Sequence, residues 1–66
     1  MKVKINGRDE DVGATQCLIS LIDGMQLDQD KIVIEYNGRI VPRDEWPVVA
    51  LNNDDRIEIV SFVGGG

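Results

Sequence analysis

The sequence predicts an α+β domain in which a mixed sheet of four or five strands packs on one main helix. Valine and isoleucine together number 16, against four leucines, and branching at Cβ favours strands. Only one segment of the 66 residues places its apolar residues at convincing helical spacing. With one helix and one sheet, the stable arrangement is two layers, so we expect the helix to cover one face of the sheet.

The beginning of the chain predicts a β-hairpin. Apolar and lysine side chains alternate over residues 1–5, as in a strand with one buried face. The pair Asn6-Gly7 that follows is a strong signal for a two-residue hairpin turn. Residues 9–12 then form a short return strand with few apolar side chains.

The single helix is expected between this hairpin and the later strands, with a length of about ten residues. Thr15 can cap it, because a hydroxyl accepts a hydrogen bond from a free N–H of the first turn. Gly24 can supply the left-handed residue that ends it. Four apolar residues at positions i, i+3, i+4 and i+7 share one helical face: Leu18, Leu21, Ile22 and Met25.

The second half of the chain predicts another hairpin and a final strand. Residues 32–36 and 39–41 flank a second Asn-Gly pair, and Pro42 ends this hairpin because it has no N–H to donate. A turn or a single helical turn over residues 43–47 and then a turn cluster lead to the last strand, residues 56–63. A hairpin, a helix and two or three further strands form the pattern of a β-grasp domain, in which the last strand lies beside the first.

The last strand leaves one question of side-chain direction open. Ile57 and Ile59 alternate with charged residues, so we expect both to face the helix. A regular strand then puts Val60 and Phe62 on the opposite face, in solvent, where a partner can grip them. The alternative is a β-bulge near Val60 that returns Phe62 to the core.

The composition excludes most enzyme chemistry. The chain has no histidine and only one cysteine, so it holds no Ser-His-Asp set, no Cys-His pair and no usual set of zinc ligands. The acidic pairs Asp28/Asp30 and Asp54/Asp55 are too sparse for a calcium loop, and we expect them in solvated turns. We therefore predict no catalytic residue, no metal and no bound cofactor.

Charge and hydropathy limit the partners. A net charge of −5 repels phosphate backbones, so we expect no nucleic-acid partner. The chain has neither the apolar run of a signal peptide nor a stretch of about 18 apolar residues that could span a membrane. Cys17 alone cannot form an internal disulfide, which fits a reducing compartment. We expect a cytoplasmic protein that is a monomer when free.

The glycine run at the end of the sequence needs an explanation. Glycine costs the most ordering entropy and adds no packing, so we expect a β-grasp domain over residues 1–62 and a flexible tail over residues 63–66. Without Cβ atoms, Gly64, Gly65 and Gly66 can thread a narrow tunnel and carry a carboxylate into another enzyme. The alternative is an unstructured end of no consequence.

Three stretches, in this order and at this spacing, are together specific enough to indicate a protein family. They are residues 37–43 followed by Trp46, the entry to the last strand at residues 54–59, and the ending Phe62-Val63-Gly64-Gly65-Gly66. In these stretches, and over essentially its whole length, the sequence resembles the ThiS family, the ubiquitin-like β-grasp sulfur carriers of thiamine biosynthesis.

The resemblance implies a carrier that partner enzymes act on. An E1-like adenylyltransferase (ThiF-like) uses ATP to adenylate the C-terminal carboxylate, here that of Gly66, and sulfur from a cysteine desulfurase persulfide displaces AMP. The resulting thiocarboxylate gives its sulfur to thiazole synthase (ThiG-like). In this picture Gly64 and Gly65 keep the approach free of side chains, and three residues meet the partner: Val60, Phe62 and Val63.

Other residues and other functions remain to be weighed. We expect Cys17 inside the helix without a direct role, because this mechanism places sulfur on the carboxylate. Trp46 and Tyr36 are expected to be packing residues. Two alternatives stay open: a sulfur carrier of a related pathway, such as molybdopterin or cysteine synthesis, and a noncatalytic β-grasp binding module whose glycine end is incidental.

Overall fold

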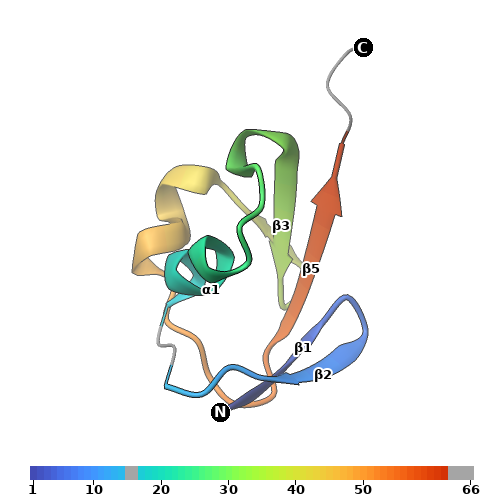
Figure 1. The fold of residues 1–66 in the computed structure, drawn as a ribbon, viewed down its shortest axis with the longest axis vertical. Coiled ribbons are helices and arrows are strands. Elements are labelled where there is room, and N and C mark those ends of the chain that lie inside the picture. The colour runs from blue at the N-terminus through green and yellow to red at the C-terminus, as the bar shows by residue number, and fades with distance from the viewer. Residues whose placement is uncertain (15–16, 63–66) are drawn as a thin grey trace.

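The computed structural model describes residues 1–14 and 17–62. Two hairpins, one α-helix, two 3-10 helices and a final strand follow one another along the chain (Figure 1). The elements are β1 (Lys2–Ile5), β2 (Arg8–Asp11), α1 (Leu18–Gly24), η1 (Gln29–Lys31), β3 (Ile32–Tyr36), β4 (Arg39–Val41), η2 (Arg43–Val48) and β5 (Arg56–Ser61). Within these two ranges, no helix has the length and apolar character needed to cross a membrane.

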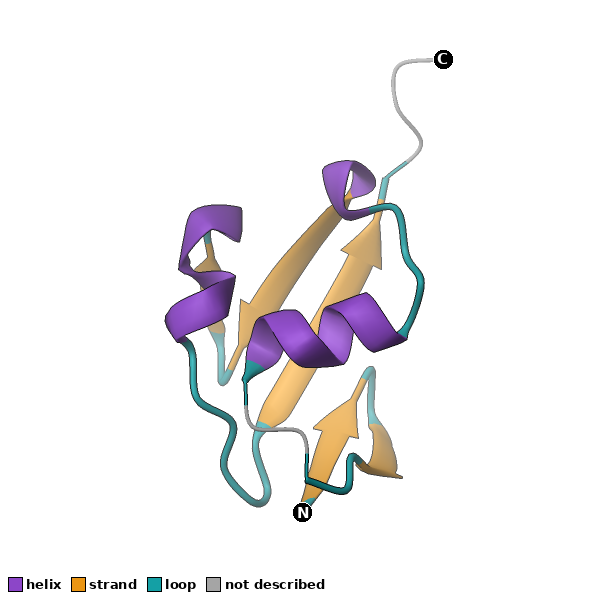
Figure 2. Ribbon diagram, turned by 60° about the vertical axis from the view of Figure 1, so that its left-hand side comes forward, coloured by secondary structure: helices purple, strands orange, loops and turns teal. Residues whose placement is uncertain are grey.

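The five strands form one mixed sheet in the order β2-β1-β5-β3-β4. The last strand, β5, lies in the centre, parallel to β1 and antiparallel to β3. Figures 1 and 2 show α1, η1 and η2 on one side of this sheet. The prediction of a β-grasp fold is confirmed. We call the opposite side, on which the described residues place no helix, the outer face.

Both hairpin turns have the backbone conformation that their sequence predicts. Asn6 and Gly7 have φ angles of 50° and 81°, and Asn37 and Gly38 have 50° and 86°. A two-residue turn that matches the twist of its strands needs positive φ at both positions, which asparagine and glycine tolerate best. The two turns therefore fix the register of β1 with β2 and of β3 with β4.

The core lies between the sheet and the helical side. Among residues 1–14 and 17–62, ten hydrophobic residues contributed by strands, helices and loops are buried: Val3, Ile5, Leu18, Ile22, Ile32, Ile34, Val41, Trp46, Leu51 and Ile57. The indole Nε1 of Trp46 donates a hydrogen bond of 3.0 Å to the carbonyl oxygen of Val41, so the one polar atom of this side chain is satisfied. The prediction that Trp46 is a core residue is confirmed.

The helix differs from its prediction at both ends. It begins at Leu18, after an extended Cys17 whose side chain makes no capping bond, so Cys17 lies before the helix rather than inside it. The predicted cap, Thr15, lies outside the described residues. Gly24 is the last helical residue and is not left-handed; Gln26 takes that conformation instead, with φ of 58°. Met25 and Gln26 donate their backbone N–H groups to the carbonyl oxygens of Ile22 and Asp23, three residues earlier, so the last turn is tighter than an α-helical turn. The left-handed residue therefore follows Gly24 instead of being Gly24 itself.

Candidate functional site

The strand β5 is regular along its whole length. It pairs with β3 through five consecutive residue pairs, from Tyr36 with Ile57 to Ile32 with Ser61. The backbone N–H of Phe62 donates to the carbonyl oxygen of Lys31 at 2.9 Å, which extends the same register by one residue. The described strand therefore contains no bulge, and side chains alternate between the two sheet faces up to Phe62.

An apolar patch follows from this alternation on the outer face. Val60 is 56% exposed and Phe62 is 47% exposed, so the open question about these two side chains is settled in favour of solvent. Val33 lies opposite Val60 across the strands, and Ile40 of β4 is also exposed. We call Val33, Val60 and Phe62 the apolar patch; Ile40 lies opposite Glu35, one row further from the end of β5. Val33 comes to the patch through the pairing of β3 with β5, which the alternation along one strand does not reveal.

The patch lies where the described chain ends. Figure 1 shows β5 leading directly to this end of the molecule. The remaining predicted site residues, Val63, Gly64, Gly65 and Gly66, lie outside the described residues, and so does the predicted flexible tail. An exposed apolar surface therefore borders the point from which the glycine run continues.

The beginning of β5 is built around a buried carboxylate. Asp55 is only 6% exposed. Its Oδ2 accepts from the Tyr36 hydroxyl at 2.5 Å and from the backbone N–H of Asn52 at 2.7 Å, and its Oδ1 accepts from Nδ2 of Asn37 at 3.1 Å. The expectation of a solvated turn is wrong for Asp55, because strand β3, the turn that follows it and the loop at Asn52 bring donors to it. Burial, together with the bond to Asp55, raises the pKa of Tyr36, which fits its predicted packing role.

The two hairpin turns also hold β5 from both sides. The backbone N–H of Asn6 donates to the carbonyl oxygen of Ile57 at 2.9 Å, and the side-chain oxygen of Asn6 accepts from the N–H of Ile59 at 2.7 Å. On the other side of β5, Asn37 donates its backbone N–H to the carbonyl oxygen of Arg56 at 2.8 Å, and its side-chain oxygen accepts from the N–H of Arg56 at 2.8 Å. An asparagine at the first position of each turn was the available signal, since its amide can imitate a backbone group.

The other candidate residues do not join this site. Cys17 is half-buried, and its Sγ lies 3.0 Å from the hydroxyl of Ser20, a hydrogen bond that lowers the pKa of the thiol. Asp28 and Asp30 are exposed, and Asp30 forms an ion pair with Arg43. No group of acidic and cysteine side chains in residues 1–14 and 17–62 is placed to hold a metal ion.

Comparison with known proteins shows which protein family this chain is similar to. The model of the ThiS family matches residues 3–66. A protein from Bacillus subtilis named sulfur carrier protein ThiS is 35% identical, and the alignment covers 97% of this chain and 98% of the relative. A crystal structure of a thiamine biosynthesis protein, ThiS, from Geobacter metallireducens superposes with a TM-score of 0.85 over both complete chains. Its 23% identity supports the fold alone.

Longer relatives contain a region similar to this chain. A thiazole synthase from Paramagnetospirillum magneticum is 38% identical over all 66 residues, and one from Magnetococcus marinus is 36% identical. The chain spans only 20% of the length of each of these two relatives. The family model, in contrast, covers nearly the whole chain, and the Bacillus protein matches it almost from end to end. The chain belongs to the ThiS family.

Proposed function

We propose that this chain carries sulfur for thiazole formation in thiamine biosynthesis, as a thiocarboxylate on Gly66. The observation that carries the proposal is the match, along nearly the whole length of both proteins, to a sulfur carrier protein ThiS. The two thiazole synthases that contain a similar region favour thiamine synthesis over the molybdopterin and cysteine pathways. The chain itself supplies the reacting terminus, and its partners supply the catalysis.

The chemistry needs an activated carboxylate. A carboxylate is a poor acyl electrophile, so an E1-like adenylyltransferase joins it to AMP, with pyrophosphate leaving from ATP. The outer sulfur of a cysteine desulfurase persulfide then attacks the acyl carbon, and AMP leaves. A thiol reduces the resulting acyl disulfide, which leaves the thiocarboxylate that thiazole synthase consumes.

The folded domain supplies the docking surface for these partners. The apolar patch gives a partner side chains to bury, and exposed apolar groups next to a reactive segment mark an interaction site. Phe62 is its largest member, and aromatic side chains dominate the energetics of many interfaces. In this proposal Val63 also contacts the partner, and Gly64 and Gly65, which have no side chains, fit a narrow channel in it.

Mass spectrometry tests the proposal directly. After incubation with the adenylyltransferase, ATP, the desulfurase and cysteine, the chain should gain the mass difference between one sulfur and one oxygen atom. Deletion of Gly66 should abolish this gain while the thermal unfolding midpoint stays unchanged, because the residue lies beyond every described element.

Cys17→Ser is the matched control for the position of the sulfur. This variant should gain the same mass as the wild type, because the proposal places sulfur on the carboxylate and not on the only thiol of the chain. A truncated chain that still gains sulfur, or a C17S chain that does not, would contradict the proposal.

A further inference from the structure

The two hairpin turns have the same sequence but are anchored differently. Each turn reads Asn-Gly-Arg, at residues 6–8 and at residues 37–39. Asn-Gly is the dipeptide that most readily loses ammonia, because glycine has no side chain to hinder attack by its own backbone nitrogen. Both asparagines are exposed, so water reaches both. The sequence alone therefore gives the two sites the same reactivity, and a difference between them must come from the fold.

The reaction closes a five-membered ring. The glycine nitrogen loses its proton to a base in the solvent and attacks Cγ of the asparagine. The bond between Cγ and Nδ2 breaks, and this nitrogen takes up a proton and leaves as ammonia. Water then opens the succinimide at one of its two carbonyl groups, which gives aspartate or isoaspartate. The net change is one water molecule taken up and one ammonia released, without enzyme, cofactor or oxidant.

The folded turns do not have the geometry for this attack. The ring closes only when the glycine nitrogen lies on the same side of the Cα–C bond as Cβ. Asn6 and Asn37 both have φ of 50°, and their glycines follow with φ of 81° and 86°, as in a type I′ turn. In such a turn ψ of the first residue is about 30°, which puts the glycine nitrogen nearly opposite Cβ. Each turn must therefore open first, so the rate depends on the free energy of local opening.

The side chain of Asn37 has one more bond to lose than that of Asn6. Its Oδ1 accepts from the N–H of Arg56 at 2.8 Å, and its Nδ2 donates to Oδ1 of the buried Asp55 at 3.1 Å. A hydrogen bond to a carboxylate is stronger than one between neutral groups. Asn6 accepts a bond from Ile59 at 2.7 Å, but among the described residues its Nδ2 has no acceptor. The attack at Asn37 therefore requires one additional, charge-assisted bond to break.

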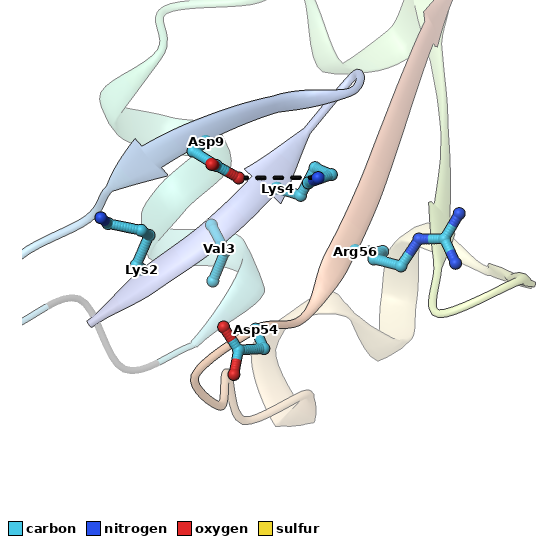
Figure 3. Close-up of a pocket in the computed structure, with 6 residues that line it drawn as sticks. All are labelled: Lys2, Val3, Lys4, Asp9, Asp54 and Arg56. Atoms are coloured by element: carbon cyan, nitrogen blue, oxygen red, sulfur yellow. Dashed lines mark ion pairs between the residues drawn. The ribbon is translucent and has the colours of Figure 1, made fainter.

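The strand that follows the first turn is held weakly. All four residues of β2 are exposed, and the strand pairs with β1 at the edge of the sheet. Figure 3 shows Lys4 of β1 joined to Asp9 of β2 by an ion pair, at 3.7 Å. Both side chains are about half exposed or more, so this pair contributes little. A strand without buried side chains opens at a low free energy.

The strands on both sides of the second turn are anchored in the core. Tyr36, directly before the turn, donates its hydroxyl to Asp55. The strand after the turn, β4, ends at Val41, which is buried and accepts a hydrogen bond from Trp46. Opening the second turn therefore disturbs core contacts that the first turn does not have.

We propose that Asn6 is a site of spontaneous deamidation in the folded protein and that Asn37 is protected by its bond to Asp55. Aspartate at position 6 keeps an acceptor for the N–H of Ile59, whereas isoaspartate adds a carbon atom to the backbone and disrupts the two-residue turn. The inference concerns the folded domain alone and does not depend on sulfur transfer.

Peptide mapping by mass spectrometry after long incubation at mildly alkaline pH tests the proposal. Trypsin cuts after Lys4, Arg8, Lys31 and Arg39, so each asparagine lies in its own peptide. In the folded protein Asn6 should react about tenfold faster than Asn37 or more, the effect of one hydrogen bond to a charged group. In concentrated urea the two rates should agree within about twofold. Equal rates in the folded protein, or a faster reaction at Asn37, would overturn the inference.

Asp55→Ala tests the cause of the protection. In a variant shown to be folded by circular dichroism, Asn37 should react about tenfold faster than in the wild type, while Asn6 keeps its rate. Leu18→Ala is the matched control, because it also lowers stability but removes a buried side chain of the helix. Its two rates should keep the wild-type ratio. An unchanged ratio in D55A, or an equal change of the ratio in both variants, would overturn the role of Asp55. The comparison of folded and urea-unfolded wild type decides on Asn6 even if D55A does not fold.

Discussion

The two ends of β5 differ in what holds them. At the beginning, Ile57 is fully buried and Asp55 accepts hydrogen bonds from three groups. At the end, Val60 and Phe62 point into solvent, and a backbone hydrogen bond joins Phe62 to Lys31, the last residue of η1. The comparison teaches that one strand has two different ends: its beginning is built into the core and stabilises the fold, and its end exposes apolar side chains, to which the proposed function assigns partner binding.

The largest effects are expected when one apolar residue at each end of β5 is replaced by alanine. Ile57→Ala leaves a cavity in the core and should lower the free energy of unfolding by about 3 kcal/mol. Phe62→Ala removes a half-exposed ring and should cost less than about 1 kcal/mol, yet weaken partner binding by about tenfold. Urea unfolding and calorimetric titration measure the two quantities. A large loss of stability in F62A with unchanged binding would erase the contrast.

The second prediction compares two neighbouring aspartates at the beginning of the strand. Asp55→Ala leaves the N–H of Asn52 and the amide of Asn37 without their acceptor, and it should cost about 2 kcal/mol of unfolding free energy. Asp54→Asn should change it by less than about 0.5 kcal/mol, because Asp54 is exposed and asparagine tolerates its φ of 71°. Equal losses in the two variants would mean that the buried carboxylate does not stabilise this end.

The smallest expected effect is a pH dependence of stability at the beginning of β5, where Tyr36 bonds to Asp55. The pKa of Tyr36 lies above its usual value of 10.0, first because of burial and then because of Asp55. The folded state therefore holds this proton more tightly than the unfolded state. The resulting stability is present below pH 10 and is lost as the pH rises through the folded pKa.

Tyr36→Phe is the variant that isolates this effect, because Tyr36 is the only tyrosine in the chain. The free energy of unfolding of the wild type should fall more steeply above about pH 10 than that of Y36F. The two proteins differ only at this side chain, so the difference between their curves reports on Tyr36. Parallel curves would contradict the assignment.

The sequence predicted those parts of the fold that depend on neighbouring residues. The Asn-Gly turns were predicted because the required backbone conformation is a property of two adjacent residues. The beginning of the helix was not, because Cys17 is held extended by a bridge to Ala50, which is far away along the chain. The position of β5 beside β1 is likewise a contact between the two ends of the sequence.

The candidate site divides in the same way. Alternation predicted that Val60 and Phe62 share a face, but only pairing with β3 shows that no bulge intervenes. The burial of Asp55 depends on Tyr36 and Asn37, which come from the other hairpin, so its acidic neighbourhood in the sequence suggested an exposed turn. The roles proposed for Gly64, Gly65 and Gly66 stay predictions.

The central position of β5 also determines how the domain responds to force. A partner that draws on the residues after Phe62 pulls along β5, across the hydrogen bonds that join it to β3, which run perpendicular to the strand. On the other side, β1 and Asn6 resist the same pull. These bonds are loaded in shear and must break together rather than one after another. The domain should therefore resist unfolding when force is applied along β5.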